Sequence, residues 1–200
     1  MWLTPILGAV QGILGGTFDP PHVAHLVAAE AAYRQFGLNG VTFLPAGAPW
    51  QKAGRPVSSA DHRWEMTQLA IADVPYFDAD DREVRRDGWT YTADTLATMD
   101  DDARVLLILG ADAALGLPTW HRYEEVLDRA QIAVVPRPGV DPSAFDSMLA
   151  AGLFWVDAPE LTVSGTELRL RVSEGRSIRF LVRDTVWRYI EDQGLYRDDE

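Results

Sequence analysis

The feature that most constrains this chain is a run of five consecutive apolar residues, Val-Leu-Leu-Ile-Leu, at positions 105–109. A strand with one face in water alternates apolar and polar residues, whereas this run is apolar throughout. Such a short run is typical of a strand buried on both faces, and strands of that kind occur mainly in parallel sheets covered by helices. The run therefore favours an α/β fold.

Further short apolar runs alternate with longer segments that are typical of helices. This alternation predicts a Rossmann-like parallel sheet with helices on both faces, formed by residues 1–200 as a single domain, with residues 1–8 as an N-terminal tail. Strands are expected at 10–14, 41–44, 105–109, 132–135 and 154–156, an extended segment at 77–85, and helices at 23–36, 59–73, 92–99, 123–130, 145–150, 166–173 and 183–193.

The charge of the chain limits its partners. Eighteen basic against 30 acidic residues give a formal net charge of −12, so neither DNA nor RNA is expected to bind. The absence of cysteine excludes thiolate catalysis and disulfides, and it fits a cytoplasmic location. Residues 1–16 are uncharged but interrupted by Pro5, Gln11 and glycines, so no signal peptide or membrane span is expected there. The sequence leaves open whether the chain forms a homo-oligomer.

A glycine pair separates the first predicted strand from the first predicted helix. Gly15 and Gly16 allow a tight turn and a close approach of the backbone to a ligand. The helix is expected to begin near His22, where its unpaired N–H groups and dipole favour an anion. His22 and His25 are three residues apart, so both lie on one face near the helix start. With the hydroxyl of Thr17, these side chains can donate hydrogen bonds to phosphate oxygens.

Two other interpretations of this segment stay open. The glycines can form an ordinary turn followed by two surface histidines. The histidines and Asp19 can also be zinc ligands, although no other ligand cluster nearby completes such a site. The spacing is not G-x-G-x-x-G, and no G-x-x-x-x-G-K-[ST] motif occurs, so a dinucleotide fingerprint and a Walker loop are absent.

A second candidate anion site lies near the end of the chain, in Val-Ser-Gly-Thr-Glu-Leu-Arg at 163–169. Ser164 or Thr166 can cap the following helix, with Arg169 on its first turn. A helix N-terminus and an arginine together can bind phosphate, because the guanidinium can hold two oxygens at once. Alone, this pattern favours a capped helix with a solvated arginine; together with the first loop, it favours a phosphate site.

Both segments resemble motifs of the nucleotidyltransferases related to class I aminoacyl-tRNA synthetases. Residues 15–25 are similar to their GGTFDPxHxGH signature, with Ala24 in place of the usual glycine, and 163–169 resemble ISSTxIR, with Gly165 in place of the middle serine. The resemblance implies catalytic roles for His22, His25 and Arg169. It also implies an ATP site formed by Gly15, Gly16, Thr17, Phe18, Gly110, Asp112, Ser164 and Thr166.

Other segments resemble the nicotinate mononucleotide adenylyltransferase branch, so the likeness covers about residues 12–196. Residues 44–52 are similar to its LPxxxPPHK loop; Trp50 and Gln51 depart from the pattern, while Lys52 matches and is implied to be catalytic. Four further matches are YTxDTL at 91–96, GADA at 110–113, LPxW at 117–120 and RPG at 137–139, and residues 175–179 and 194–196 resemble the tail.

The matched residues suit nicotinate, which has a flat ring and a carboxylate. A ring needs an aromatic face and a carboxylate needs N–H donors. The resemblance implies that the pyridine ring lies against Trp120 and Tyr91, beside Thr92 at a predicted helix start. Asp112 is placed to accept hydrogen bonds from a ribose, and Arg137 to meet a substrate phosphate. Alternatively, Trp120 is a core aromatic, Asp112 a helix N-cap and Arg137 a solvated loop cation.

The resemblance implies an enzyme of NAD biosynthesis that transfers an adenylyl group from ATP to nicotinate mononucleotide, giving deamido-NAD and pyrophosphate. The attacking phosphate oxygen is already anionic, so catalysis needs positioning and charge stabilisation rather than a base. Mg²⁺ is expected to arrive with ATP, held by phosphates and water. Two alternatives stay open: phosphopantetheine adenylyltransferase, which is usually shorter and lacks the 90–96 and 117–120 segments, and a nucleotide-binding protein without turnover.

Overall fold

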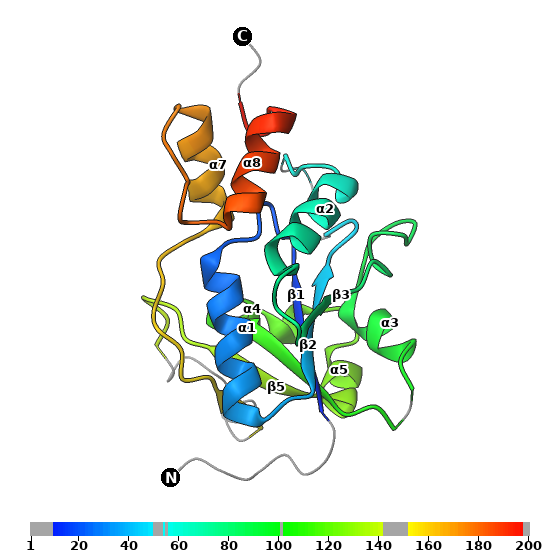
Figure 1. The fold of residues 1–200 in the computed structure, drawn as a ribbon. Helices are drawn as coiled ribbons and strands as arrows, with labels where there is room; N and C mark the ends of the chain where they lie inside the picture. The colour runs from blue at the N-terminus through cyan, green and yellow to red at the C-terminus, as the bar shows by residue number, and fades with distance from the viewer. Residues whose placement is uncertain (1–9, 50–53, 55, 101, 142–151, 198–200) are drawn as a thin grey trace.

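The computed structural model describes residues 10–49, 54, 56–100, 102–141 and 152–197. Six strands in this part of the chain form one parallel sheet in the order β3-β2-β1-β4-β5-β6 (Figure 1). The order of connection reverses between β1 and β4, and open α/β sheets bind their ligands beyond the carboxyl ends of strands at such a point. The strands are Gln11–Gly16 (β1), Gly40–Pro45 (β2), Phe77–Ala79 (β3), Val105–Gly110 (β4), Ala130–Val135 (β5) and Leu153–Trp155 (β6).

Helices cover both faces of the sheet. Successive strand residues point to opposite faces, so Leu14 and Ile108 belong to one apolar cluster and Ile13 and Leu107 to another. The first cluster includes residues of α1 (Val23–Phe36), α2 (Ala60–Ile71), α7 (Gly165–Ser173) and α8 (Asp184–Gln193); the last three gather beyond the carboxyl ends of the strands (Figure 1). The second includes residues of α3 (Thr92–Ala97), α4 (Ala111–Leu115), the 3-10 helix η2 (Leu117–Thr119) and α5 (Tyr123–Arg129).

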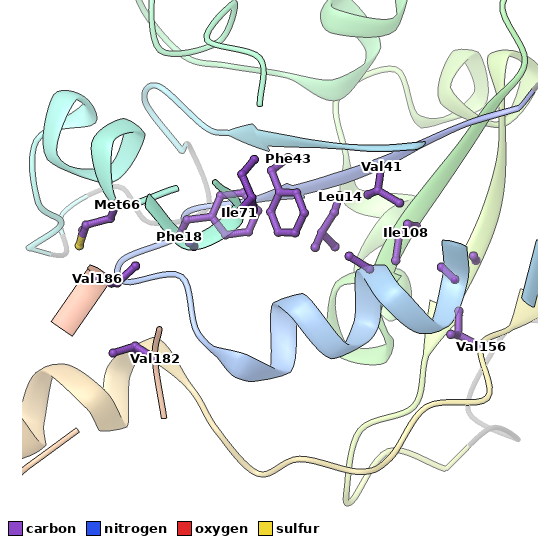
Figure 2. Close-up of a cluster of buried hydrophobic side chains, with 14 of the residues drawn as sticks. Leu14, Phe18, Val41, Phe43, Met66, Ile71, Ile108, Val156, Val182 and Val186 are labelled. Atoms are coloured by element: carbon purple, nitrogen blue, oxygen red, sulfur yellow. The ribbon is translucent and has the colours of Figure 1, made fainter. Parts of the chain in front are cut away.

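The apolar run at 105–109 lies in β4, at the middle of the sheet, and each of its residues is at most 5% exposed. Figure 2 shows Leu14, Phe43 and Ile108 pointing from three strands toward α1. Small, fully buried residues of α1, Ala29 and Ala32, let this helix lie close to the sheet. The predicted parallel sheet with helices on both faces is confirmed, and the helix predicted at 23–36 coincides with α1.

The structure differs from the sequence-based expectation in two places. The segment 77–85, expected to be extended, is a strand only at β3; residues 82–85 form turns, and the Asp80 side chain accepts a hydrogen bond from the N–H of Arg82 at 2.9 Å. The expectation also omitted α4 and η2, which follow β4. The predicted helix at 145–150 and the N-terminal tail lie outside the described residues. Among the described helices, none has the length and apolar character needed to span a membrane.

Candidate active site

The loop between β1 and α1 brings the two histidines together at the switch point of the sheet. His22 is the N-cap residue of α1, and its backbone N–H donates to Nδ1 of His25 at 3.1 Å. The two imidazole rings stack, with their centroids 3.7 Å apart. The ring of Phe18 meets His25 edge-on at 5.0 Å and contacts Phe43 of β2 at 5.6 Å. The shared face expected from the three-residue spacing is therefore present.

His22 has an unusual electrostatic environment. Its side chain is 3% exposed, and its Nδ1 has no hydrogen-bond partner among the described residues. Burial, reinforced by the positive charge of Arg137, lowers the pKa of His22 from 6.5 to about 4. The imidazole is therefore neutral at pH 7 in the unliganded protein. A buried nitrogen without a partner is a group that a ligand can satisfy.

Arg63, a residue that the sequence analysis did not single out, fixes the loops that follow β1 and β2. It lies in α2 and is 1% exposed. Its guanidinium donates to the carbonyl oxygens of Thr17 at 3.0 Å, Gly47 at 2.7 Å and also Ala46, and its Nε donates to Ser58 at 3.0 Å. A buried cation is tolerated where all three of its nitrogens are hydrogen-bonded in this way. An arginine in a predicted helix gives no sequence signal for this role, because most are solvated.

The second candidate anion site lies directly against the first. Ser164 caps α7, its Oγ accepting from the N–H of Glu167 at 3.2 Å. Arg169, expected on the first turn, is on the second; its guanidinium reaches the Asp19 carbonyl at 2.7 Å and Thr166 Oγ1 at 3.4 Å. A Cβ on Gly165 would lie 2.7 Å from the Asp19 carbonyl oxygen, so the absence of a side chain allows α7 to approach the β1–α1 loop. The structure thus joins the two sites that the motifs predict.

The ends of β4 and β5 carry a third part of the site. Gly110 ends β4 and is the N-cap of α4, so the alternative of Asp112 as N-cap is wrong. Arg137, which follows β5, places its Nε 3.3 Å from Asp112 Oδ1. A Cβ on Gly110 would lie 2.8 Å from the Asp112 carboxylate and 3.0 Å from Arg137 Nε. Gly110 therefore leaves room for this ion pair beside His22.

Two pockets open at the carboxyl edge of the sheet, one on each face. A pocket of about 50 Å³ lies on the α1 face, and one of about 180 Å³ lies on the α3 face. Arg137 lines the smaller pocket, together with residues of α1 and β4, rather than the aromatic pocket with Trp120. We call them the α1 pocket, lined by Leu14, Ala24, His25, Gly110, Pro136, Arg137, Pro159 and Leu161 among others, and the aromatic pocket, lined by Gly15, Gly16, Thr17, Glu83, Tyr91, Thr92, Trp120 and His121 among others.

The aromatic pocket collects the rings expected to contact a pyridine. Tyr91 is the N-cap of α3, and its ring lies 4.5 Å from that of His121. Trp120 is half-buried and also packs against the apolar cluster of that face, so it is both a core contact and a pocket wall. Glu83, which the sequence analysis did not identify, is 6% exposed at this wall and accepts from Thr95 Oγ1 at 2.6 Å. Burial raises the pKa of Glu83.

Lys52 lies outside the described residues. The zinc interpretation of His22, His25 and Asp19 finds no support, because the Asp19 carboxylate accepts hydrogen bonds from Tyr196 and Ser58 instead. No group of three or more potential metal ligands occurs among the residues that the structure describes.

Comparison with known proteins matches this chain to one family over most of its length. The cytidylyltransferase-like family model covers residues 13–171. A protein of Desulfitobacterium hafniense named probable nicotinate-nucleotide adenylyltransferase is 41% identical over 196 residues, which is 93% of this chain and 95% of the relative. A protein of the same name from Streptomyces coelicolor is 42% identical over 190 residues, covering 93% of this chain and the whole of the relative.

The fold is shared with a solved structure. The Plasmodium falciparum nicotinic acid mononucleotide adenylyltransferase complexed with NaAD has a TM-score of 0.80 to this chain, covering 94% of this chain and 98% of its own. Its sequence is only 18% identical, so this likeness concerns the fold. The family model and the curated relatives decide the family: the chain belongs to the cytidylyltransferase-like family and, within it, to the nicotinate-nucleotide adenylyltransferases.

Proposed function

We propose that this protein transfers the adenylyl group of ATP to nicotinate mononucleotide, forming deamido-NAD and releasing pyrophosphate. The observation that carries the proposal is the arrangement of two pockets on either side of one switch point, with Gly15, Gly16 and Thr17 beside the aromatic one and His25 in the wall of the other. A reaction between two nucleotides needs two such pockets that meet at the transferred phosphorus. The name shared by curated relatives over 93% of this chain supports the same reaction.

In this proposal the α1 pocket takes the adenosine of ATP, and its phosphates lie along the start of α1. Pro136, Pro159 and Leu161 offer an apolar surface for the base. Asp112, held by Arg137, is placed to accept from the ribose hydroxyls. The phosphates meet the N–H groups at the start of α1, where the helix dipole favours an anion. The remaining proposed contacts come from Gly15, Gly16, Thr17, Phe18, Gly110, Ser164 and Thr166.

The aromatic pocket takes the acceptor. The pyridine ring stacks against Trp120 and Tyr91, and Thr92 lies at the start of α3 beside them. We propose that Arg137 contributes to phosphate binding from the other side of the switch point, since it lies close enough to His22 to lower its pKa.

The chemical step requires that the negative charge around the α-phosphorus and on the departing pyrophosphate be stabilised. A phosphate oxygen of the acceptor forms a bond to this phosphorus as the bond to the bridging oxygen breaks, and pyrophosphate leaves with the electron pair. Neutral His22, and His25 stacked against it, can donate hydrogen bonds to phosphate oxygens, and Arg169 supplies a permanent charge. Lys52 is proposed as a second charge. Mg²⁺ enters with ATP as part of the substrate and neutralises the phosphates further.

The test is release of pyrophosphate from ATP with each candidate acceptor in turn. We expect kcat/KM for nicotinate mononucleotide to exceed that for nicotinamide mononucleotide by at least about tenfold, or about 1.4 kcal/mol. Equal turnover of the two, or turnover of phosphopantetheine alone, would contradict the proposed acceptor. ATP binding without pyrophosphate release would indicate a nucleotide-binding protein without turnover.

The whole chain, 1–200, is taken as one nucleotidyltransferase domain. A cytoplasmic location agrees with a role in NAD biosynthesis. Light scattering on the purified protein measures whether the chain forms a homo-oligomer.

A further inference from the structure

Asp19 is a buried acid in the β1–α1 loop to which the proposed reaction assigns no role. Its side chain is 1% exposed. Its Oδ1 accepts a hydrogen bond from the Tyr196 hydroxyl at 2.7 Å, and its Oδ2 accepts from the backbone N–H of Ser58 at 3.3 Å. Its backbone carbonyl holds Arg169 Nη1 at 2.7 Å, and the same nitrogen lies 3.6 Å from Oδ2. Asp19 therefore connects the C-terminal segment to the arginine of the phosphate site.

Tyr196 comes to this contact from 177 positions away in the chain. It has a φ of +65°, and Phe18, next to Asp19, has a φ of +52°. Residues other than glycine rarely adopt this left-handed conformation, so the packing on both sides of the hydrogen bond holds the backbone in place. Burial and the charge of Asp19 raise the pKa of the Tyr196 hydroxyl, which therefore stays protonated and donates.

The hydrogen bonds to Asp19 bear on the contact between its carboxylate and the guanidinium of Arg169. An unrestrained carboxylate at 3.6 Å would move closer and form a short ion pair with the guanidinium. Tyr196 and Ser58 each hold one of the carboxylate oxygens and keep it where it is. Arg169 makes its short hydrogen bond to the neutral backbone carbonyl instead, and its ion pair with the carboxylate stays at the longer distance of 3.6 Å.

We propose that Tyr196 is a positioning residue for ATP: by holding Asp19, it keeps the guanidinium of Arg169 oriented and available for the triphosphate. The identity of that ligand rests on the proposed function. Tyr196 acts through Asp19 and Arg169 rather than by contact with the nucleotide. The C-terminal segment 194–197 thereby completes a site that begins at residue 15.

The test compares Tyr196→Phe with Tyr189→Phe in the full chain. Both changes remove one phenolic hydroxyl near the C-terminus, but the Tyr189 hydroxyl pairs with His62 Nδ1 at 2.8 Å instead of Asp19. We expect Tyr196→Phe to raise the Kd and KM for ATP about tenfold, as when a charged group loses a buried hydrogen bond, and to leave the acceptor KM within about twofold. Tyr189→Phe should leave ATP affinity within about twofold. A lower Tm without weaker ATP binding would overturn the proposal.

Adding Tyr196→Phe to two other variants shows whether its effect on ATP binding depends on Asp19 and Arg169. In Arg169→Ala, adding Tyr196→Phe should change the Kd for ATP less than about twofold, because the group being positioned is gone. In Asp19→Asn, where no carboxylate competes, it should also have little effect. Independent, multiplying losses in both backgrounds would overturn the proposal. ATP binding can be measured by calorimetry without an acceptor. If the wild-type protein fails to bind ATP, the proposed function is contradicted. If the wild-type protein binds ATP and Tyr196→Phe leaves the affinity unchanged, only this inference is contradicted.

Discussion

The two pockets at the carboxyl edge of the sheet are built in different ways. The β1–α1 loop, which runs from the aromatic pocket to the start of α1, is held by polar groups from distant parts of the chain: Arg63 of α2, Arg169 of α7 and Tyr196 after α8. The aromatic pocket has half-buried rings from short elements, with Trp120 ending η2 and Tyr91 preceding α3. Fixed phosphate geometry matters most where a bond is made, whereas an acceptor ring needs mainly a flat surface.

This difference has an energetic side. Asp19 and Arg63 are each at most 3% exposed, and a buried charge is tolerated only while its hydrogen bonds are complete. Loss of one partner leaves the other group unsatisfied, which costs about 1–3 kcal/mol or more. A half-buried tryptophan contributes mainly contact area. Substitutions on the α1 side should therefore change rate, ATP binding and stability, and those on the aromatic side should change acceptor binding.

The largest effect is expected for His25→Ala. Nδ1 of His25 accepts from the His22 N–H, so the neutral ring carries its proton on Nε2, which suits donation to a phosphate oxygen. Loss of one such donor should lower kcat about 10²–10³-fold and change the KM for ATP less. His22→Ala should behave similarly, with a less than additive double variant.

Steady-state kinetics on folded protein check this expectation, with metal content measured on the same preparations. His62→Ala is the control, because His62 of α2 pairs with Tyr189 of α8 and lines neither pocket. A well-folded His25→Ala protein with near-normal kcat would refute the catalytic role. Stoichiometric zinc that disappears in the variant would instead revive the metal interpretation.

The second prediction concerns stability in acid, to which two buried groups, His22 and Glu83, should contribute with opposite sign. The pKa of His22 falls from 6.5 to about 4 on folding, so the unfolded chain binds more protons between these pH values. The stability contributed by neutral His22 is thus present above pH 6.5 and lost as the pH falls to 4, by up to about 3 kcal/mol. The pKa of Glu83 is raised by burial, so its contribution is present at low pH and lost as the pH rises through its folded pKa.

Urea unfolding at intervals from pH 7 to pH 4 measures both effects. His22→Gln should lose less stability on acidification than the wild-type protein. Glu83→Gln lacks the stability that Glu83 contributes at low pH, so its free energy of unfolding should fall more steeply on acidification than that of the wild-type protein. Parallel profiles for all three proteins would show that neither buried group is linked to folding as the geometry indicates.

The sequence predicts the fold and the meeting of the two motifs for definable reasons. The apolar run of β4 has a pattern that only a doubly covered strand requires, and α1 begins directly after its N-cap His22 and ends before Gly37, which has a φ of +60°. Because parallel strands end at one edge, motifs that follow them must converge there. Local patterns of this kind need no knowledge of distant contacts.

The groups that support the site leave no such pattern. Arg63 looks like a solvated helix residue, and Tyr196 meets Asp19 across 177 positions. Glu83 lies in a turn that the sequence presents as an extended segment, so its burial against Thr95 could not be expected. These roles depend on which side chain faces which loop after folding, and the periodicity of the sequence does not predict such contacts.

The third prediction tests the aromatic side. Trp120→Ala removes a stacking face, so the KM for nicotinate mononucleotide should rise about tenfold while the Kd for ATP changes little. Trp187→Ala is a matched control, because Trp187 packs against the cluster on the opposite face and lines neither pocket. Equal loss of ATP and acceptor binding in Trp120→Ala, together with a lower Tm, would make Trp120 a core residue alone and remove the contrast between the pockets.

The smallest effect is expected for Gly165→Ala, which tests how closely α7 must pack against the β1–α1 loop. The new Cβ would lie 2.7 Å from the Asp19 carbonyl oxygen and 3.3 Å from Arg169 Nη1, so the start of α7 has to move away from the β1–α1 loop. Arg169 then loses part of its hold on that carbonyl, and the KM for ATP should rise about threefold to fivefold with the acceptor KM unchanged. Alanine favours a helix over glycine by up to about 1 kcal/mol, which should offset much of the stability cost. Gly165→Ser carries the same Cβ and should behave alike, whereas a Cβ at Gly152 meets no atom within 4 Å, so Gly152→Ala should have no effect. Unchanged ATP kinetics in both Gly165 variants would mean that the two anion sites tolerate more movement than their contacts suggest.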